Sequence, residues 1–128
     1  MQLMLARTGA VFYVLWGVLH IGVAWKISEL ALAQEGLIQG RLLQQAVYML
    51  GIATTAIVVA VWLNWRNDRV GYWVNLAVVS FADIAFLLVI VLPGYVPLGR
   101  GLIGPALWVV ALIFTTLAQR DRAAGIRA

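Results

Sequence analysis

The sequence predicts an all-α fold, a bundle of four transmembrane helices in a single domain spanning residues 1–128. Three observations lead to this class. Of the 128 residues, 64% are hydrophobic and only 11% are charged, whereas a soluble domain carries roughly 25% charged residues. The apolar residues gather in four long runs separated by charged or Pro/Gly-rich stretches. Because backbone groups in lipid must pair within their own segment, each run is expected to form a helix.

The limits of the four spans follow from the lengths of the runs, since a hydrocarbon core of about 30 Å requires about 20 apolar residues. The first run exceeds the apolar region of about 7–15 residues in a signal peptide, which favours a membrane span. Charged turns at 66–69 and 120–122 end the second and fourth runs. The expected spans are about 8–25, 43–65, 70–92 and 102–118.

Two connecting stretches differ from the runs. Residues 34–45 mix polar residues with glycine and are expected to form an external loop or an interfacial helix. Residues 93–105 are punctuated by proline and glycine without a helical period, and Arg100 is their only charge. This second stretch is expected to be an extracellular turn, with a lid or re-entrant cap over an outward-facing pocket as the alternative.

The distribution of Lys and Arg predicts the orientation, because cytoplasmic loops carry an excess of them. The sides hold six and three basic residues, so we expect both termini to be cytoplasmic, in an inner or plasma membrane. The first side carries Arg7, Arg66, Arg69, Arg120, Arg122 and Arg127, and the second carries Lys26, Arg41 and Arg100.

Several classes of chemistry are excluded by composition. The chain has no cysteine and a single histidine, which removes disulfides, thiolate nucleophiles and a multi-His metal site within one chain. The net charge of +4 does not indicate nucleic-acid binding, because the basic residues do not cluster on one face. The sequence requires no cofactor.

Polar and small residues are expected to face the interior of a membrane bundle. When each span is turned at 100° per residue, such residues fall on one face of every helix. The four faces are Tyr13, Trp16, Gly17, His20 and Ala24; Gln44, Tyr48, Gly51, Thr55 and Trp62; Tyr72, Asn75, Val79, Asp83 and Phe86; and Gly104, Trp108, Ala111 and Thr115.

Helical spacing places His20 and Asp83 at one depth. His20 lies 13 residues after Arg7, and Asp83 lies 14 after Arg69, so both sit about 20 Å from the cytoplasmic boundary. A pocket at this level is the candidate site, with His20 and Asp83 as its catalytic pair. The expected ligand-binding residues around the pair are Trp16, Tyr48, Thr55, Asn75 and Trp108, among which Thr55 and Asn75 also suit hydrogen bonding between helices.

Asp83 is the most informative single residue. A charged side chain near mid-membrane costs several kcal/mol, so such residues are rare and are usually paired or functional. His20 can share a proton with the carboxyl of Asp83, and such an Asp–imidazole pair would stabilise the charged form of the carboxyl. Alternatively, Asp83 has no chemical role, and its carboxyl only holds the first and third spans together through a hydrogen bond.

These residues support a lipophilic small-molecule binding protein with an intrabundle pocket. The His20–Asp83 pair suits proton transfer, so the protein could be an enzyme of the isomerase or lyase class, performing acid/base isomerisation or ring opening. Membrane lipid surrounds such a bundle, and a homo-oligomer is expected because four short helices form a thin bundle.

Three alternatives remain open at the level of sequence. The first is a haem b membrane protein with His20 as axial ligand. The second is a small proton-coupled transporter that uses Asp83. The third is an accessory or assembly subunit of a membrane complex, docked through the face of the second span that carries Ala53, Ala56 and Ala60.

Overall fold

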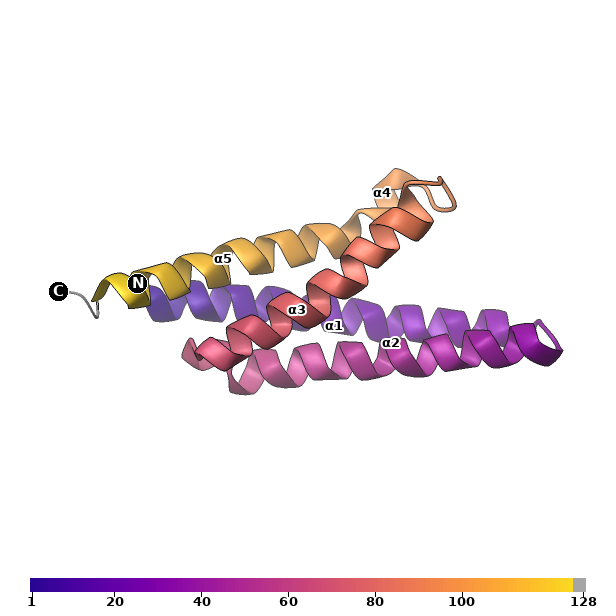
Figure 1. Ribbon diagram of the computed structural model, residues 1–128, viewed down its shortest axis with the longest axis horizontal. Helices are drawn as coiled ribbons and strands as arrows, with labels where there is room; N and C mark the ends of the chain where they lie inside the picture. The colour runs from indigo at the N-terminus through magenta and orange to yellow at the C-terminus, as the bar shows by residue number, and fades with distance from the viewer. Residues whose placement is uncertain (126–128) are drawn as a thin grey trace.

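The computed structural model describes residues 1–125, and the regular elements in that range are all helical (Figure 1). Four helices are long and apolar enough to cross a membrane, so the predicted class, an all-α transmembrane bundle, is confirmed. In chain order the elements are α1 (Gln2–Leu32), α2 (Gly36–Trp62), the 3₁₀ turn η1 (Asn64–Arg66), α3 (Arg69–Phe86), the π-helix η2 (Leu87–Val91), α4 (Leu98–Gly101) and α5 (Ile103–Gly125).

The helices exceed the predicted spans. The first span was expected at about 8–25, yet α1 has 31 residues, and α2 begins at Gly36 rather than near residue 43. The expected loop or interfacial helix at 34–45 is therefore mostly the first turns of α2. Polar residues do not interrupt a helix where it leaves the hydrocarbon, which explains the difference. Likewise, α4 and the start of α5 shorten the expected loop at 93–105.

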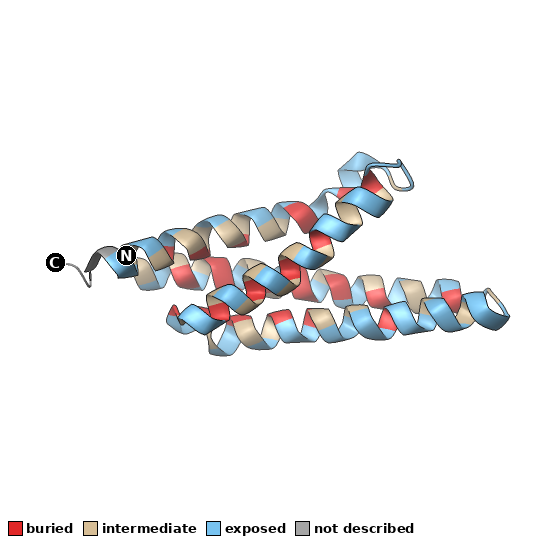
Figure 2. Cartoon of the chain, in the orientation of Figure 1, coloured by how far each residue is buried: buried red, intermediate tan, exposed pale blue. Residues whose placement is uncertain are grey.

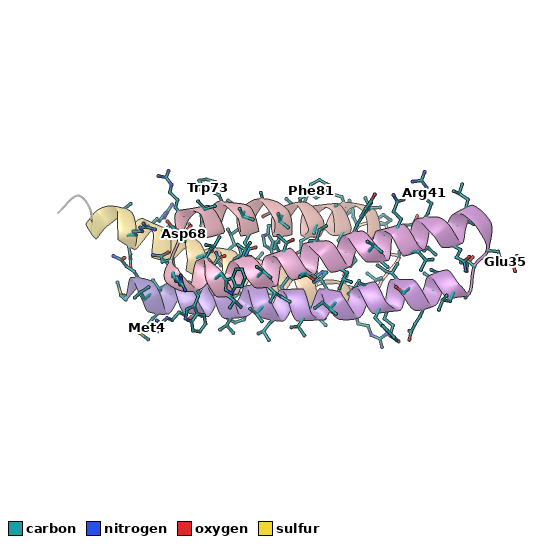
Figure 3. All side chains as sticks on the ribbon, turned by 90° about the horizontal axis from the view of Figure 1, so that it is seen from below. Met4, Glu35, Arg41, Asp68, Trp73 and Phe81 are labelled. Carbon is teal, nitrogen blue, oxygen red and sulfur yellow. The ribbon has the colours of Figure 1, made fainter. Side chains whose placement is uncertain are left out.

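The bundle has two distinct ends (Figure 1). The N-terminus, the C-terminal end of α5 and the turn at 63–68 lie at one end, which we call the termini end. The α1–α2 connection and α4 lie at the other, the hairpin end, where the α1–α2 pair extends beyond α4 and α5. Figure 3 places Met4 and Asp68 toward the termini end and Glu35 at the tip of the hairpin. Arg127, one of the basic residues used to predict orientation, lies outside the described residues.

Helix α1 is the central element, because it packs along both α2 and α5. Glycines permit the close approach. A Cβ on Gly9 would lie 2.6 Å from Thr115 Cγ2 of α5. A Cβ on Gly17 would collide with Ile57 Cγ1 and lie 3.0 Å from the carbonyl oxygen of Ala53. Close approach at small residues replaces the hydrophobic driving force that lipid does not provide.

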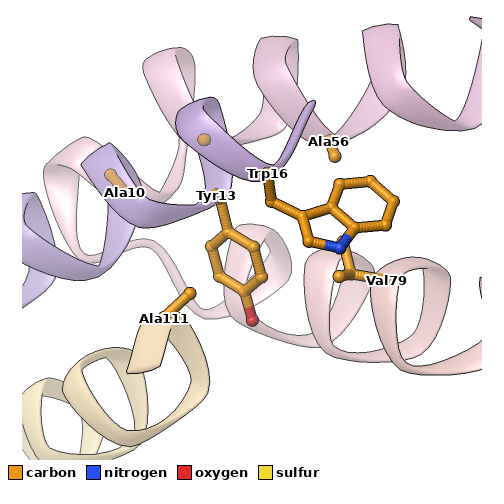
Figure 4. Packing of buried hydrophobic residues seen from close by; sticks show 7 residues of the cluster. Ala10, Tyr13, Trp16, Ala56, Val79 and Ala111 are labelled. Atoms are coloured by element: carbon orange, nitrogen blue, oxygen red, sulfur yellow. The ribbon is translucent and has the colours of Figure 1, made fainter. Parts of the chain in front are cut away.

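The core gathers where α3 crosses the other helices. Tyr13 and Trp16 extend from α1 into this space beside Val79 of α3 and Ala111 of α5 (Figure 4). Both aromatic side chains are fully buried. Buried positions line the facing sides of the helices, whereas the projecting hairpin is mostly exposed (Figure 2). Trp16 also connects this core to the two residues of the candidate site, His20 and Asp83.

The predicted inward faces of the first, third and fourth spans are buried or half-buried, but the face predicted for the second span is wrong. Tyr48 is 60% exposed, Trp62 is 67% exposed, and Thr55 is also exposed. The face of α2 that is buried consists of alanines: Ala46, Ala53, Ala56 and Ala60. Alanine allows α1 and α2 to approach closely, and this geometric requirement outweighs polarity along α2.

Candidate functional site

Two residues one helical turn apart on α1 form the base of the site. The rings of Trp16 and His20 stack, with centroids 3.8 Å apart and planes inclined by 23°. His20 Nδ1 lies 2.8 Å from the carbonyl oxygen of Trp16. Because a carbonyl can only accept, Nδ1 is the protonated nitrogen, and a neutral imidazole then carries its lone pair on Nε2.

Asp83 reaches this pair from α3. Its side chain is fully buried, and Oδ2 accepts a hydrogen bond of 2.7 Å from Trp16 Nε1. The other oxygen, Oδ1, is buried and has no hydrogen-bond partner among the described residues. Buried polar atoms are nearly always paired, so an orphaned oxygen requires an explanation.

Gly104, near the start of α5, brings the two functional groups together. An ideal Cβ on Gly104 would lie 3.0 Å from His20 Cε1, 3.5 Å from His20 Nε2 and 3.6 Å from Asp83 Oδ1. Both polar atoms therefore border the same bare stretch of α5 backbone. A side chain at this position would press on the imidazole, so glycine permits α5 to pack this closely against both groups.

His20 and Asp83 do not bond to each other. Within residues 1–125 the only ion pair joins Lys26 and Glu29, and the carboxyl of Asp83 pairs with an indole rather than with the imidazole. The helical spacing correctly places the two residues at one level, but the expected direct pair is not formed. Instead, two hydrogen-bond acceptors, His20 Nε2 and Asp83 Oδ1, lie beside Gly104, and no donor group within residues 1–125 bridges them.

The helix that carries Asp83 changes its geometry just beyond it. The N–H of Leu87 still bonds to the carbonyl oxygen of Asp83, and the five residues from Leu87 to Val91 then form a π-helix. π-Helical turns are rare and occur frequently at functional sites. The widened turn lies between Asp83 and the loop that leads to α4.

The other predicted ligand-binding residues lie apart from this cluster. Trp108 Nε1 donates to Ser80 Oγ (3.0 Å). Asn75 Nδ2 donates to the carbonyl oxygen of Ala56 (3.2 Å) and contacts the side-chain amide of Asn64 (3.0 Å), which ties α3 to α2. Tyr48 and Thr55 face outward and do not wall the His20–Asp83 level.

The immediate surroundings of His20 are tightly packed. The best-formed grooves on the described surface have volumes of about 350–560 Å³, and none of these is lined by His20 or Asp83. A haem bound through Nε2 would need its flat macrocycle to pass between His20 and Gly104, where a single Cβ would already lie 3.5 Å from Nε2. The residues present therefore do not fit a porphyrin.

Sequence reasoning missed three parts of the site: the indole as partner of the carboxyl, Gly104 as the point of closest approach, and the π-helix. The spacing of four between Trp16 and His20 is the one available signal, because residues i and i+4 lie on the same helical face. The position of Gly104 depends on the relative placement of α1, α3 and α5, which no spacing within a helix reveals.

The fold and this cluster define the class: a small polytopic membrane protein with a buried carboxyl–indole–imidazole site. No protein-family model, curated protein or solved structure matches the chain.

Proposed function

We propose that this protein binds a lipophilic small molecule whose hydrogen-bond donor, a hydroxyl or an amine, inserts between His20 Nε2 and Asp83 Oδ1. One observation carries the proposal: Oδ1 is buried without a partner among the described residues, and both Oδ1 and His20 Nε2 lie beside the backbone of Gly104. Two acceptors that share no donor suit a ligand that supplies one.

Acid/base chemistry is the activity that such a site supports. His20 Nε2 can take a proton from a bound molecule and return it at another position, which isomerises the molecule without an oxidant or reductant. In an eliminative ring opening, His20 removes a proton from carbon, and the electrons of that C–H bond form a double bond. The carbon–heteroatom bond of the ring breaks, its electrons stay on the heteroatom, and the heteroatom then receives the proton from His20. Asp83 would stabilise the imidazolium formed in between.

Access is proposed from the hairpin end. There α3 diverges from the α1–α2 pair (Figure 1), and the π-helix and α4 connect it to α5. A change of the π-turn to α-helix would shift Asp83 relative to the loop, so this segment is the natural gate. The packed state of the site would then be its closed form.

Native mass spectrometry of protein extracted from its own membrane tests the binding. We expect wild type to retain a small molecule, and Asp83→Asn, His20→Ala and Gly104→Ala to lose it. Glu35→Gln removes a carboxylate at the exposed hairpin tip, and Gly51→Ala adds a Cβ that meets no atom within 4 Å. Both controls should retain the molecule.

The retained molecule, identified by its mass, can be returned in excess and its conversion followed by chromatography. Conversion that persists in His20→Ala would end the acid/base proposal. The same masses give the copy number, which tests the homo-oligomer that stays a prediction.

An accessory or assembly subunit is the second candidate, and the tight packing favours it. In that case the Trp16–Asp83 hydrogen bond only ties α1 to α3. No retained molecule in wild type, with all variants assembling alike, would select this function.

A further inference from the structure

A second built feature lies far from His20, at the termini end. A groove of about 560 Å³ runs between α3 and α5 and is lined by Arg69, Arg120 and Arg122 together with polar and aromatic side chains. None of the three guanidinium groups takes part in an ion pair within the described part of the chain. The groove therefore concentrates positive charge that the protein itself does not neutralise.

Asn67 fixes the shape of this groove. It has a left-handed backbone (φ 56°), and its carbonyl oxygen accepts from Arg122 Nη1 (2.7 Å) and from Gln119 Nε2 (3.2 Å). Its side chain accepts from Gln119 (2.9 Å) and donates to the carbonyl oxygen of Ala118 (3.1 Å). The turn before α3 is thus held against α5, with one arginine oriented by the turn itself.

The nearby acids are directed away from the groove. Asp68 caps α3, and its Oδ1 accepts the N–H groups of Val70 and Gly71 (2.7 and 3.2 Å). Asp121 lines a different groove, beside Met1, Gln2 and Leu3.

We propose that this groove binds the phosphodiester of an anionic membrane lipid. Arginine is suited to phosphate because its planar guanidinium donates two parallel hydrogen bonds. Arg69 begins the third candidate membrane span and Arg120 lies near the end of the fourth, a position that suits contact with lipid headgroups. Trp73 also lines the groove, is 55% exposed and projects outward from α3 (Figure 3), as aromatic residues do at a membrane surface.

The test titrates phosphatidylglycerol, or phosphatidylcholine, into the detergent-solubilised full chain and measures lipid adducts by native mass spectrometry. The double variant Arg69→Gln/Arg120→Gln removes two positive charges from the groove. It leaves the hydrogen bond from Arg122 to the carbonyl oxygen of Asn67 intact. The control Arg7→Gln/Arg66→Gln removes two charges at the same end, where Arg7 lies over the Trp65 ring (5.4 Å), outside the groove.

We expect wild type and the control to bind phosphatidylglycerol more tightly than phosphatidylcholine. The groove variant should lose about 30-fold in affinity for phosphatidylglycerol, given about one tenfold step per 1.4 kcal/mol and about 1 kcal/mol per arginine.

Three results would overturn the proposal. Equal losses in both double variants would show diffuse attraction to the basic end. Equal affinity of wild type for both lipids would remove the anionic selectivity. Displacement of phosphatidylglycerol by millimolar inorganic phosphate would assign the groove to a soluble anion.

Discussion

At the scale of single residues, Asp83 depends on one donor. Trp16 Nε1 is its only hydrogen-bond partner among the described residues. Burying a carboxyl on one neutral donor is costly in lipid, where no solvent can complete its hydrogen bonds. The position of the Asp83 carboxyl thus depends on its hydrogen bond to Trp16.

We predict that Trp16→Phe destabilises the bundle by about 1–3 kcal/mol, because it leaves a buried carboxyl without any partner. The matched variant Trp108→Phe removes a donor to the half-buried Ser80, and should cost about 0.6 kcal/mol, the average for hydrogen bonds in membranes. Unfolding titrations in mixed detergent micelles compare the two. Equal losses would show that Asp83 does not rely on the indole.

At the scale of helices, the sequence predicts the faces of α1 and α3 that carry a buried ionisable residue, but not the alanine face of α2. His20 and Asp83 stand out because ionisable groups are rare in apolar runs, and their helical faces follow from the period of 3.6. The buried face of α2 consists of alanines, which differ little in polarity from the surrounding Val, Leu and Ile. Its polar residues, such as Tyr48, lie on the outside, where Gln44 Nε2 bonds to the Tyr48 hydroxyl (2.7 Å).

Glycine contacts give a test of the α1–α2 packing. Gly17→Leu should destabilise the bundle by about 1–3 kcal/mol through overpacking, because Ile57 and the Ala53 carbonyl already contact this position. Gly22→Leu, on the same helix, meets no atom within 4 Å and should leave the unfolding free energy nearly unchanged. A similar loss in both variants would contradict the packing seen at Gly17.

At the scale of the whole molecule, helix length exceeds bilayer thickness. Helix α1, with 31 residues, is about 46 Å long, against a hydrocarbon core of about 30 Å. The α1–α2 hairpin therefore reaches beyond the apolar layer. The excess of Lys and Arg at the termini end predicts that this hairpin projects on the non-cytoplasmic side.

The absence of cysteine allows a direct test of that orientation. A membrane-impermeant maleimide should label Glu35→Cys in intact cells, since Glu35 lies at the hairpin tip (Figure 3). Met4→Cys, which is 75% exposed at the termini end, should react only after the cells are permeabilised. The reverse pattern would invert the predicted topology.

The bonds of Asn67 also carry a consequence for biosynthesis. Its partners Ala118, Gln119 and Arg122 belong to the last helix, although Asn67 itself precedes the third. During translation the turn between the second and third spans is therefore made long before the groups that complete it. The nascent chain can satisfy this turn only when its final segment has entered the membrane, which links integrity of the C-terminal helix to the closure of the bundle.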